Sequence, residues 1–178
     1  MEITATTLAA QPFLRGLAQR HLELLVADAM PAVFKAGELI LEEGGPANRF
    51  YLIRSGKVVL QAPRDLEHDP IPIDTIEAGG VLGWSWLFPP HFWHFDARTL
   101  TPVQAIFFYG TRLREQCDAD PELGYELMKR VGAVVIERLQ ATRRRLAEWD
   151  KRINTVSVAA ESCSNDEKQK AGFRAGQK

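Results

Sequence analysis

The sequence predicts a mainly β protein with flanking helices, in which a sandwich or rolled barrel of short strands lies between an N-terminal helical segment and a long C-terminal helix. Between residues 10 and 30, apolar residues recur at the three- and four-residue steps of a helix. Between residues 32 and 109, roughly eight short apolar segments are separated by glycine-rich corners, a pattern typical of strands in a sandwich or barrel. Helical spacing returns from residue 111 to about 152.

The composition is that of one ordinary domain. The 178 residues are 46% hydrophobic and 25% charged, with a net charge of −1, which gives no reason to expect binding to nucleic acid or to an anionic membrane. The two cysteines, Cys117 and Cys163, are too far apart for a C-x-x-C motif, so neither a disulfide framework nor a zinc site is expected. No signal peptide or membrane span is visible, and we expect a cytoplasmic protein.

The elements are expected in the following order. A first helix over residues 10–30 ends at Pro31, which cannot continue it. The β-roll follows over residues 32–109. Within it the Ser55–Gly56 dipeptide, between two alternating apolar runs, predicts a tight hairpin.

Helices are expected again over residues 111–152, with Pro121 as the first residue of the long one. Residues 153–178 are polar and rich in Gly and Lys, and we expect a disordered tail there.

The long helix carries an apolar seam. Its members step by three and four residues over about three heptads, the spacing of a coiled coil. This spacing predicts a homodimer through residues 121–150, and the alternative is a helix that lies on the barrel of its own chain. The predicted interface residues are Met128, Val131, Val135, Leu139, Thr142 and Leu146, and the seam runs on to Trp149.

Two stretches of the β-region resemble the cyclic-nucleotide-binding domain family, the sensor half of catabolite-activator-type regulators. They are "FKAGELILEEGGPANRFYLIRSGKVVL" (34–60) and "IEAGGVLGWSWLF" (76–88), and the resemblance covers about residues 12–150. It implies an eight-stranded antiparallel jelly roll followed by a long C-terminal helix. In the family a winged helix-turn-helix follows that helix, but only residues 151–178 follow Asp150 here, so direct sequence-specific DNA binding is not expected.

The resemblance also implies where a ligand would bind. Family members that bind cyclic nucleotides have a Gly-Glu-Leu-Ala run, in which backbone N–H groups face the phosphate and the Glu accepts a hydrogen bond from the ribose. An Arg about ten residues further on pairs with the phosphate. This sequence keeps Gly83 but has Trp84 in place of the Glu, and the Arg position falls near Trp93 or His94. The candidate ligand-binding residues are Gly83, Trp84, Ser85, Trp86, Leu87, Trp93, His94 and Arg98.

These departures predict weak or no binding of cyclic AMP and cyclic GMP. Loss of an arginine–phosphate pair costs roughly 2–5 kcal/mol and loss of a hydroxyl acceptor roughly 1–3 kcal/mol. A micromolar site is worth only about 8 kcal/mol in all. The aromatic residues between Trp84 and Phe95 could line an apolar pocket instead, or they could fill the old pocket as core.

The first hypothesis is therefore a non-enzymatic regulatory module that binds a different small ligand or a protein partner. No catalytic motif is visible, and no cofactor is expected. His91 and His94 lack the further ligands of a metal site, so we expect no metal. One alternative is a genuine sensor of cyclic AMP or cyclic GMP in which Arg98 supplies the countercharge. Another is a transcription-regulator-like protein that acts through a partner.

Overall fold

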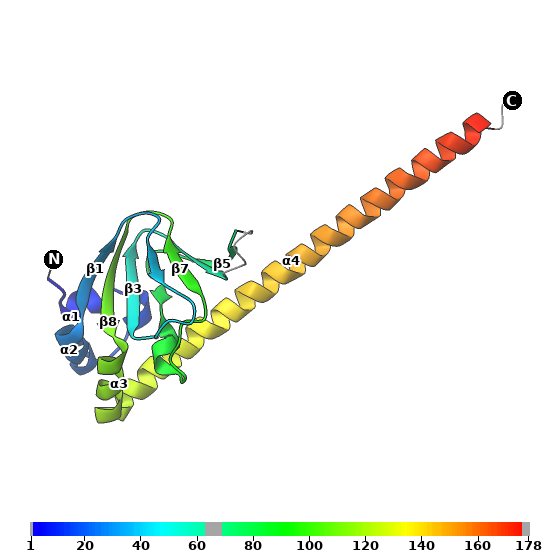
Figure 1. Ribbon diagram of the computed structural model, residues 1–178. Coiled ribbons are helices and arrows are strands. Elements are labelled where there is room, and N and C mark those ends of the chain that lie inside the picture. The colour runs from blue at the N-terminus through cyan, green and yellow to red at the C-terminus, as the bar shows by residue number, and fades with distance from the viewer. Residues whose placement is uncertain (1, 63–68, 176–178) are drawn as a thin grey trace. The chain divides into compact units, whose positions relative to one another are not determined.

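The computed structural model describes residues 2–62 and 69–175, with side chains as far as residue 150. Three short helical segments come first, namely α1 (Ala5–Ala9), the 3-10 helix η1 (Pro12–Leu14) and α2 (Gln19–Asp28). Two helices end the chain, α3 (Gly110–Ala119) and α4 (Pro121–Ala175) (Figure 1). By its internal contacts the chain divides into two units, Met1–Ala133 and Val134–Lys178. No helix among the described residues is both long and apolar enough to cross a membrane.

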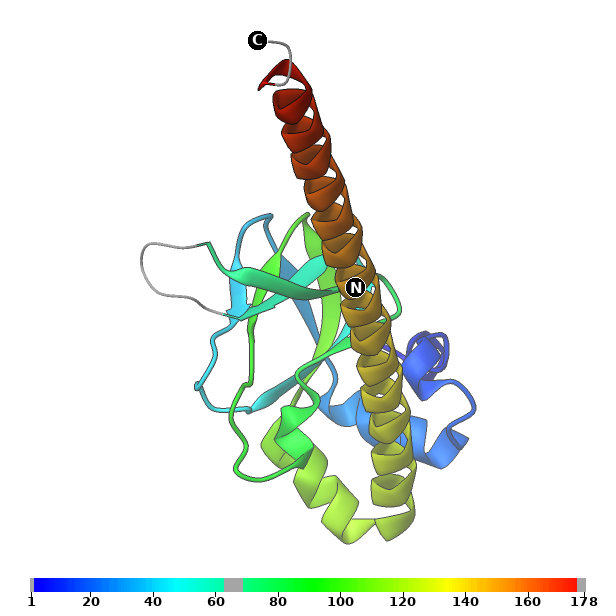
Figure 2. The same cartoon turned by 90° about the vertical axis from the view of Figure 1, so that its right-hand side faces the viewer.

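Eight strands lie between the two sets of helices, and a second 3-10 helix, η2 (Trp84–Leu87), separates the sixth strand from the seventh. The strands are β1 (Met30–Phe34), β2 (Leu39–Leu41), β3 (Arg49–Ser55), β4 (Val58–Ala62), β5 (Ile71–Ile76), β6 (Val81–Leu82), β7 (Asp96–Thr99) and β8 (Val103–Tyr109). They form two four-stranded sheets, ordered β1-β8-β3-β6 and β2-β7-β4-β5, and all of their pairings are antiparallel. The predicted eight-stranded antiparallel jelly roll is confirmed (Figure 2).

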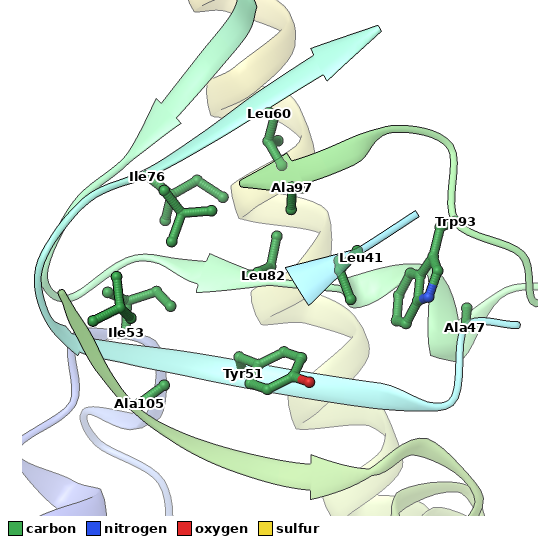
Figure 3. Close-up of a cluster of buried hydrophobic side chains, with 12 residues drawn as sticks. Leu41, Ala47, Tyr51, Ile53, Leu60, Ile76, Leu82, Trp93, Ala97 and Ala105 are labelled. Atoms are coloured by element: carbon green, nitrogen blue, oxygen red, sulfur yellow. The ribbon is translucent and has the colours of Figure 1, made fainter. Parts of the chain in front are cut away.

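The interior of the roll is filled by side chains from both sheets. On β3, Tyr51 and Ile53 point inward, as alternation along a strand requires, and they meet Leu60 of β4 and Ala97 of β7. Trp93 joins the same cluster from the segment between η2 and β7 (Figure 3). The first sheet is thus buried on its interior face by the second sheet and by one tryptophan.

The opposite face of the first sheet is buried by aromatic rings from helical segments. Phe50 of β3 lies 5.2 Å from Phe13 of η1 and 6.1 Å from Trp86 of η2, between ring centroids. Phe108 of β8 lies 6.4 Å from Phe50 on this face. Phe50 and Tyr51 are therefore both buried although they point to opposite sides of the sheet.

The single helix predicted over residues 10–30 is wrong. Pro12 opens the short helix η1, and Gly16 adopts a φ of 76°, which does not fit a right-handed helix. Helix α2 ends at Asp28, and Pro31 lies inside β1, a strand at the edge of its sheet. Proline is tolerated there because an edge strand leaves one row of N–H groups unpaired.

The predicted hairpin at Ser55–Gly56 is also wrong in its pairing. The turn is present, with a φ of 89° at Gly56, but β3 pairs with β6 and β8 whereas β4 pairs with β5 and β7. The turn therefore carries the chain from one sheet to the other. A methyl group on Gly56 would lie 2.3 Å from the Pro102 carbonyl oxygen, so this corner needs glycine for space as well as for its φ.

Helix α4 begins at Pro121, as predicted, and Asp120 caps it. One carboxylate oxygen of Asp120 accepts hydrogen bonds from the backbone N–H groups of Glu122 and Leu123. The backbone of α4 is helical as far as Ala175, which differs from the disordered tail expected over residues 153–178. No proline follows Pro121 and no glycine occurs between Gly132 and Gly172, so no helix-breaking residue interrupts this span. The side chains beyond residue 150 lie outside the described residues.

Candidate functional site

Gly83 and the helix η2 form the segment to which the resemblance assigns phosphate binding, and we call them the cradle segment. Gly83 precedes η2 with a φ of 85°. A methyl group on its Cα would lie 2.6 Å from the carbonyl oxygen of Arg49 and 3.1 Å from the nearest ring atoms of Trp93. The position therefore requires glycine for its φ and for the close approach of two neighbours.

Trp93 occupies the space beside the cradle segment. Its side chain is only 7% exposed and belongs to the interior cluster of the roll. Backbone hydrogen bonds hold it in place, because its N–H donates to the Gly45 carbonyl at 2.9 Å and its carbonyl accepts from the Gly44 N–H at 2.9 Å. Figure 3 shows the indole beside Ala47. The segment predicted to carry the phosphate-binding Arg thus places an aromatic ring against Gly83.

Trp86 points to the other face of the first sheet and is 1% exposed. A methyl group on Gly110 would lie 2.7 Å from its Cβ, so the tryptophan packs directly against the first residue of α3. Arg114 of α3 donates a hydrogen bond to the Trp86 carbonyl at 2.7 Å. Trp86 is therefore part of the packing between η2 and α3, away from the roll interior.

The other predicted residues of this segment do not form one site. Ser85 is buried, Leu87 is half-buried, and His94 is exposed. Trp84 is partly exposed and meets Phe88 edge-on, with 6.1 Å between ring centroids. The interpretation that all the aromatic residues line one apolar pocket is therefore wrong. They divide between the roll interior, the helix side of the sheet and the surface.

Arg98 lies on the outer side of β7. Its neighbour Ala97 faces the roll interior, so alternation turns Arg98 away from it. Its guanidinium donates a hydrogen bond to the Gly37 carbonyl at 2.7 Å. The structure does not bring this predicted residue to the cradle segment.

A different arginine, which the sequence reasoning missed, lies on the interior side of the first sheet. Arg49 begins β3, and its guanidinium carbon lies 5.8 Å from the centroid of the Phe107 ring. The signal was present in the alternation, because Arg49 is two residues before the inward-pointing Tyr51. Among the described residues, no group of three or more metal-ligating side chains is found.

The predicted seam of α4 is divided by burial. Val131 is fully buried within its own chain, together with Leu123 and Leu127. It is therefore not available to a second copy, and its place in the predicted interface is wrong. Leu139, Leu146 and Trp149 are 65–68% exposed. The remaining predicted members are Met128, Val135 and Thr142, of which Met128 and Thr142 are exposed and Val135 is half-buried.

A jelly roll with a glycine-led short helix and a long following helix defines a regulatory ligand-binding domain. The sequence model of the cyclic nucleotide-binding domain matches residues 31–120, and the chain belongs to that family. The family is defined by ligand binding rather than by catalysis.

Three relatives illustrate the likeness. A CRP-like cAMP-activated global transcriptional regulator of Mycobacterium tuberculosis (strain CDC 1551 / Oshkosh) is 27% identical over 143 residues, covering 79% of this chain and 61% of that protein. An acetyltransferase Pat of Mycolicibacterium smegmatis is 33% identical over 82 residues, covering 46% of this chain and 24% of that protein. The crystal structure of a protein from Geobacter metallireducens described as cyclic nucleotide-binding is 27% identical, with a TM-score of 0.70, covering 77% of this chain and 98% of that one. The chain thus spans less than two thirds of the curated relatives that it matches.

Proposed function

We propose that the chain is a non-enzymatic regulatory module in which the ancestral cyclic-nucleotide cradle is closed by its own tryptophan. The observation that carries the proposal is the indole of Trp93, which lies 3.1 Å from the position of a Cβ on Gly83. The ring takes the place of an arginine and occupies space beside the backbone that would face a phosphate. The module then binds a different small ligand or a protein partner.

The electrostatics of the segment support this proposal. Residues 79–95 contain no Lys, Arg, Asp or Glu, and Arg98 points away from the roll interior. Transfer of an unpaired phosphate from water into such a site costs several kcal/mol even after relaxation. The alternative of a genuine cyclic AMP or cyclic GMP sensor that uses Arg98 loses its countercharge in this geometry.

Titration calorimetry with cyclic AMP and cyclic GMP tests the proposal. We expect no binding by the native chain at concentrations up to about 1 mM, which corresponds to less than about 4 kcal/mol of binding free energy. In Trp93→Ala the space beside Gly83 opens, and weak nucleotide binding appears. Trp84→Ala is the matched control, because Trp84 lies partly exposed outside the interior cluster. Binding by the native chain at or below about 10 μM would overturn the proposal.

Exposed apolar residues along α4 support pairing with a second copy of the chain. Such pairing is the way in which the module would transmit its state. Leu139, Leu146 and Trp149 expose large apolar surfaces, and they step by seven and three residues along the helix. We expect sedimentation to show a dimer at micromolar concentration and Leu139→Glu to shift it toward monomer. Gln140→Glu is the control, because it adds the same single negative charge at an exposed position of the helix outside the predicted seam. The transcription-regulator-like alternative requires that a partner supply DNA binding.

A further inference from the structure

Four side chains extend the interior face of the first sheet to its rim. Arg49 lies opposite Tyr109 in the pairing of β3 with β8, and Tyr51 lies opposite Phe107. Residues two apart on a strand share a face, so Arg49 and Tyr109 lie on the same side of the sheet as Tyr51 and Phe107. Tyr51 is buried, whereas Arg49 and Tyr109 are exposed at the rim. We call these four residues the Arg49 platform.

The cation of this platform has aromatic neighbours and no acidic one. The pKa of Arg49 is raised, and the largest cause is the hydrogen bond that its guanidinium donates to the Tyr51 hydroxyl. No carboxylate among the residues that the structure describes forms an ion pair with Arg49. The guanidinium therefore keeps an uncompensated charge, and its planar fork has five donors, more than one phenol uses.

The rings beside the guanidinium form an angled aromatic surface. Phe107 and Tyr109 meet edge-on with 5.4 Å between centroids, and Tyr51 lies 5.9 Å from Phe107. Tyr109 is 41% exposed, so part of this surface faces solvent. A planar ring bound here gains stacking and apolar burial, while an attached anion reaches the guanidinium. One positive charge without a second cation matches a monoanion better than a doubly charged phosphate.

We propose that the Arg49 platform binds a small aromatic carboxylate, with the carboxylate on the guanidinium of Arg49 and the ring against Phe107 and Tyr109. The proposal goes beyond the proposed function, since it assigns a second site that does not require an open cradle. The two places are neighbours through the backbone, because the Arg49 carbonyl oxygen lies against Gly83. A ligand on the platform therefore contacts the residue whose carbonyl group abuts the cradle segment.

The test uses indole-3-acetate as the probe and its neutral amide, indole-3-acetamide, as the matched control ligand. Binding to the full chain is followed by the ¹H–¹⁵N signals of the arginine Nε–Hε groups at about 150 mM salt, where distant surface charges are screened. We expect the Arg49 signal to shift with a dissociation constant below about 1 mM. The amide is expected to bind at least about tenfold more weakly, because it lacks the charge-assisted pair.

Two arginine variants separate this site from general attraction to a basic surface. Arg49→Gln is expected to weaken indole-3-acetate binding at least about tenfold, and Arg49→Lys to weaken it less, because it keeps the charge and loses the fork. Arg98→Gln is the control, since Arg98 is another strand arginine that bonds to a carbonyl group. It is expected to leave the affinity unchanged. If Arg49→Gln does not fold, Phe107→Leu replaces it and is expected to weaken binding by removing the ring.

Three results would overturn the proposal. The first is no shift of the Arg49 signal at 5 mM indole-3-acetate, a concentration on the order of fivefold above the expected dissociation constant. The others are equal affinity for the acid and the amide, and an equal loss of indole-3-acetate affinity in Arg49→Gln and Arg98→Gln. Titration of the same samples with cyclic AMP keeps this outcome separate from that of the proposed function. Cyclic AMP binding with shifts at Gly83 and Trp93 would refute the closed cradle and leave the Arg49 platform standing. If neither indole-3-acetate nor cyclic AMP binds, the platform proposal is refuted and the proposed function is not.

Discussion

Trp86 and Trp93 come from one uncharged stretch of the chain, yet they pack on opposite faces of the first sheet. Trp93 joins Tyr51 in the roll interior, and Trp86 lies against Phe50 on the helix side. Both are almost fully buried. The same residue type therefore does two different things seven residues apart: one ring packs in the roll interior, and the other joins η2 to α3.

The difference separates the packing of the roll interior from the contact between η2 and α3. A change at Trp93 alters the roll interior and leaves the contact of Trp86 with α3 in place. A change at Trp86 alters the contact with Gly110 and Arg114, the residues through which η2 meets the helix before α4. Variants that change one face at a time therefore distinguish the two roles.

The largest effect is expected for Trp86→Ala. Its side chain is fully buried among rings and against Gly110, so its removal leaves a large cavity, and we expect a loss of about 3–5 kcal/mol in the free energy of unfolding. Chemical denaturation followed by circular dichroism measures it. A loss below about 1 kcal/mol would mean that the helix side of the sheet collapses around the gap, which would contradict close packing of Trp86 against Gly110.

Trp93→Ala is expected to cost less, about 2–3 kcal/mol, because Trp93 is 7% exposed whereas Trp86 is 1% exposed, so less buried surface is lost. Backbone hydrogen bonds between residues 44–47 and 91–93 do not depend on the ring and stay in place without it. The same denaturation experiment measures the loss. A larger loss than that of Trp86→Ala would reverse the comparison and make Trp93 the main structural tryptophan.

Gly83→Ala tests the contact of Gly83 with Trp93 and Arg49. The residue has a φ of 85°, and the added methyl group would meet Arg49 and Trp93, so we expect a loss of about 2–3 kcal/mol from strain and contact together. Gly44→Ala is the matched control, because Gly44 has a φ of 78° and nothing within 4 Å of the added atom. The excess of the first variant over the second measures the contact with Trp93 and Arg49. Equal losses would show that the ring does not press on Gly83.

The roll could be predicted from sequence because its signals are local. Glycine corners, alternating strands and the "GGVLGW" turn depend on backbone geometry, and the order of elements followed from them. The N-terminal helix failed for a local reason too, since Pro12 and Gly16 were given less weight than the leucine spacing. The pairing at Ser55–Gly56 failed because a tight turn does not determine which sheet receives the next strand.

The candidate site could be predicted only in part. Gly83 precedes a short helix, as the resemblance implies, and its φ of 85° is a property of the chain itself. Its role in ligand binding stays a prediction. The directions of the Trp84, Trp86 and Trp93 side chains depend on what packs against them. Their segment is rich in aromatic residues and has no charges, so it shows no alternation of polar and apolar residues that would predict which side chains point inward. The direction of Arg49 follows from the alternation of β3, but its position beside the aromatic residues of β8 depends on strand pairing, which the sequence does not show.

Acid pH is expected to weaken the cap that Asp120 forms at the start of α4. The pKa of Asp120 is lowered, first by the hydrogen bond from the Leu123 backbone N–H and further by Arg20 and His21. A lowered pKa means that the stabilisation is present above the unfolded value, about 3.9. It is lost as the pH falls below that value through the folded one.

Thermal melts below pH 5 should show a steeper decline for the native chain than for Asp120→Asn, which keeps a capping side chain and does not titrate. Asp118→Asn is the control. Parallel declines for the native chain and Asp120→Asn would contradict the role of the cap.

The smallest effect is expected for Trp84→Ala. The resemblance implies a glutamate at the position of Trp84, yet Trp84 is partly exposed, and its ring meets that of Phe88 edge-on. Loss of an exposed edge-on pair costs about 0.5–1 kcal/mol, below the loss expected for either buried tryptophan. Denaturation of the three alanine variants side by side provides the measurement. A loss at Trp84 as large as that at Trp93 would place its ring inside the roll and restore the single aromatic pocket that the structure divides.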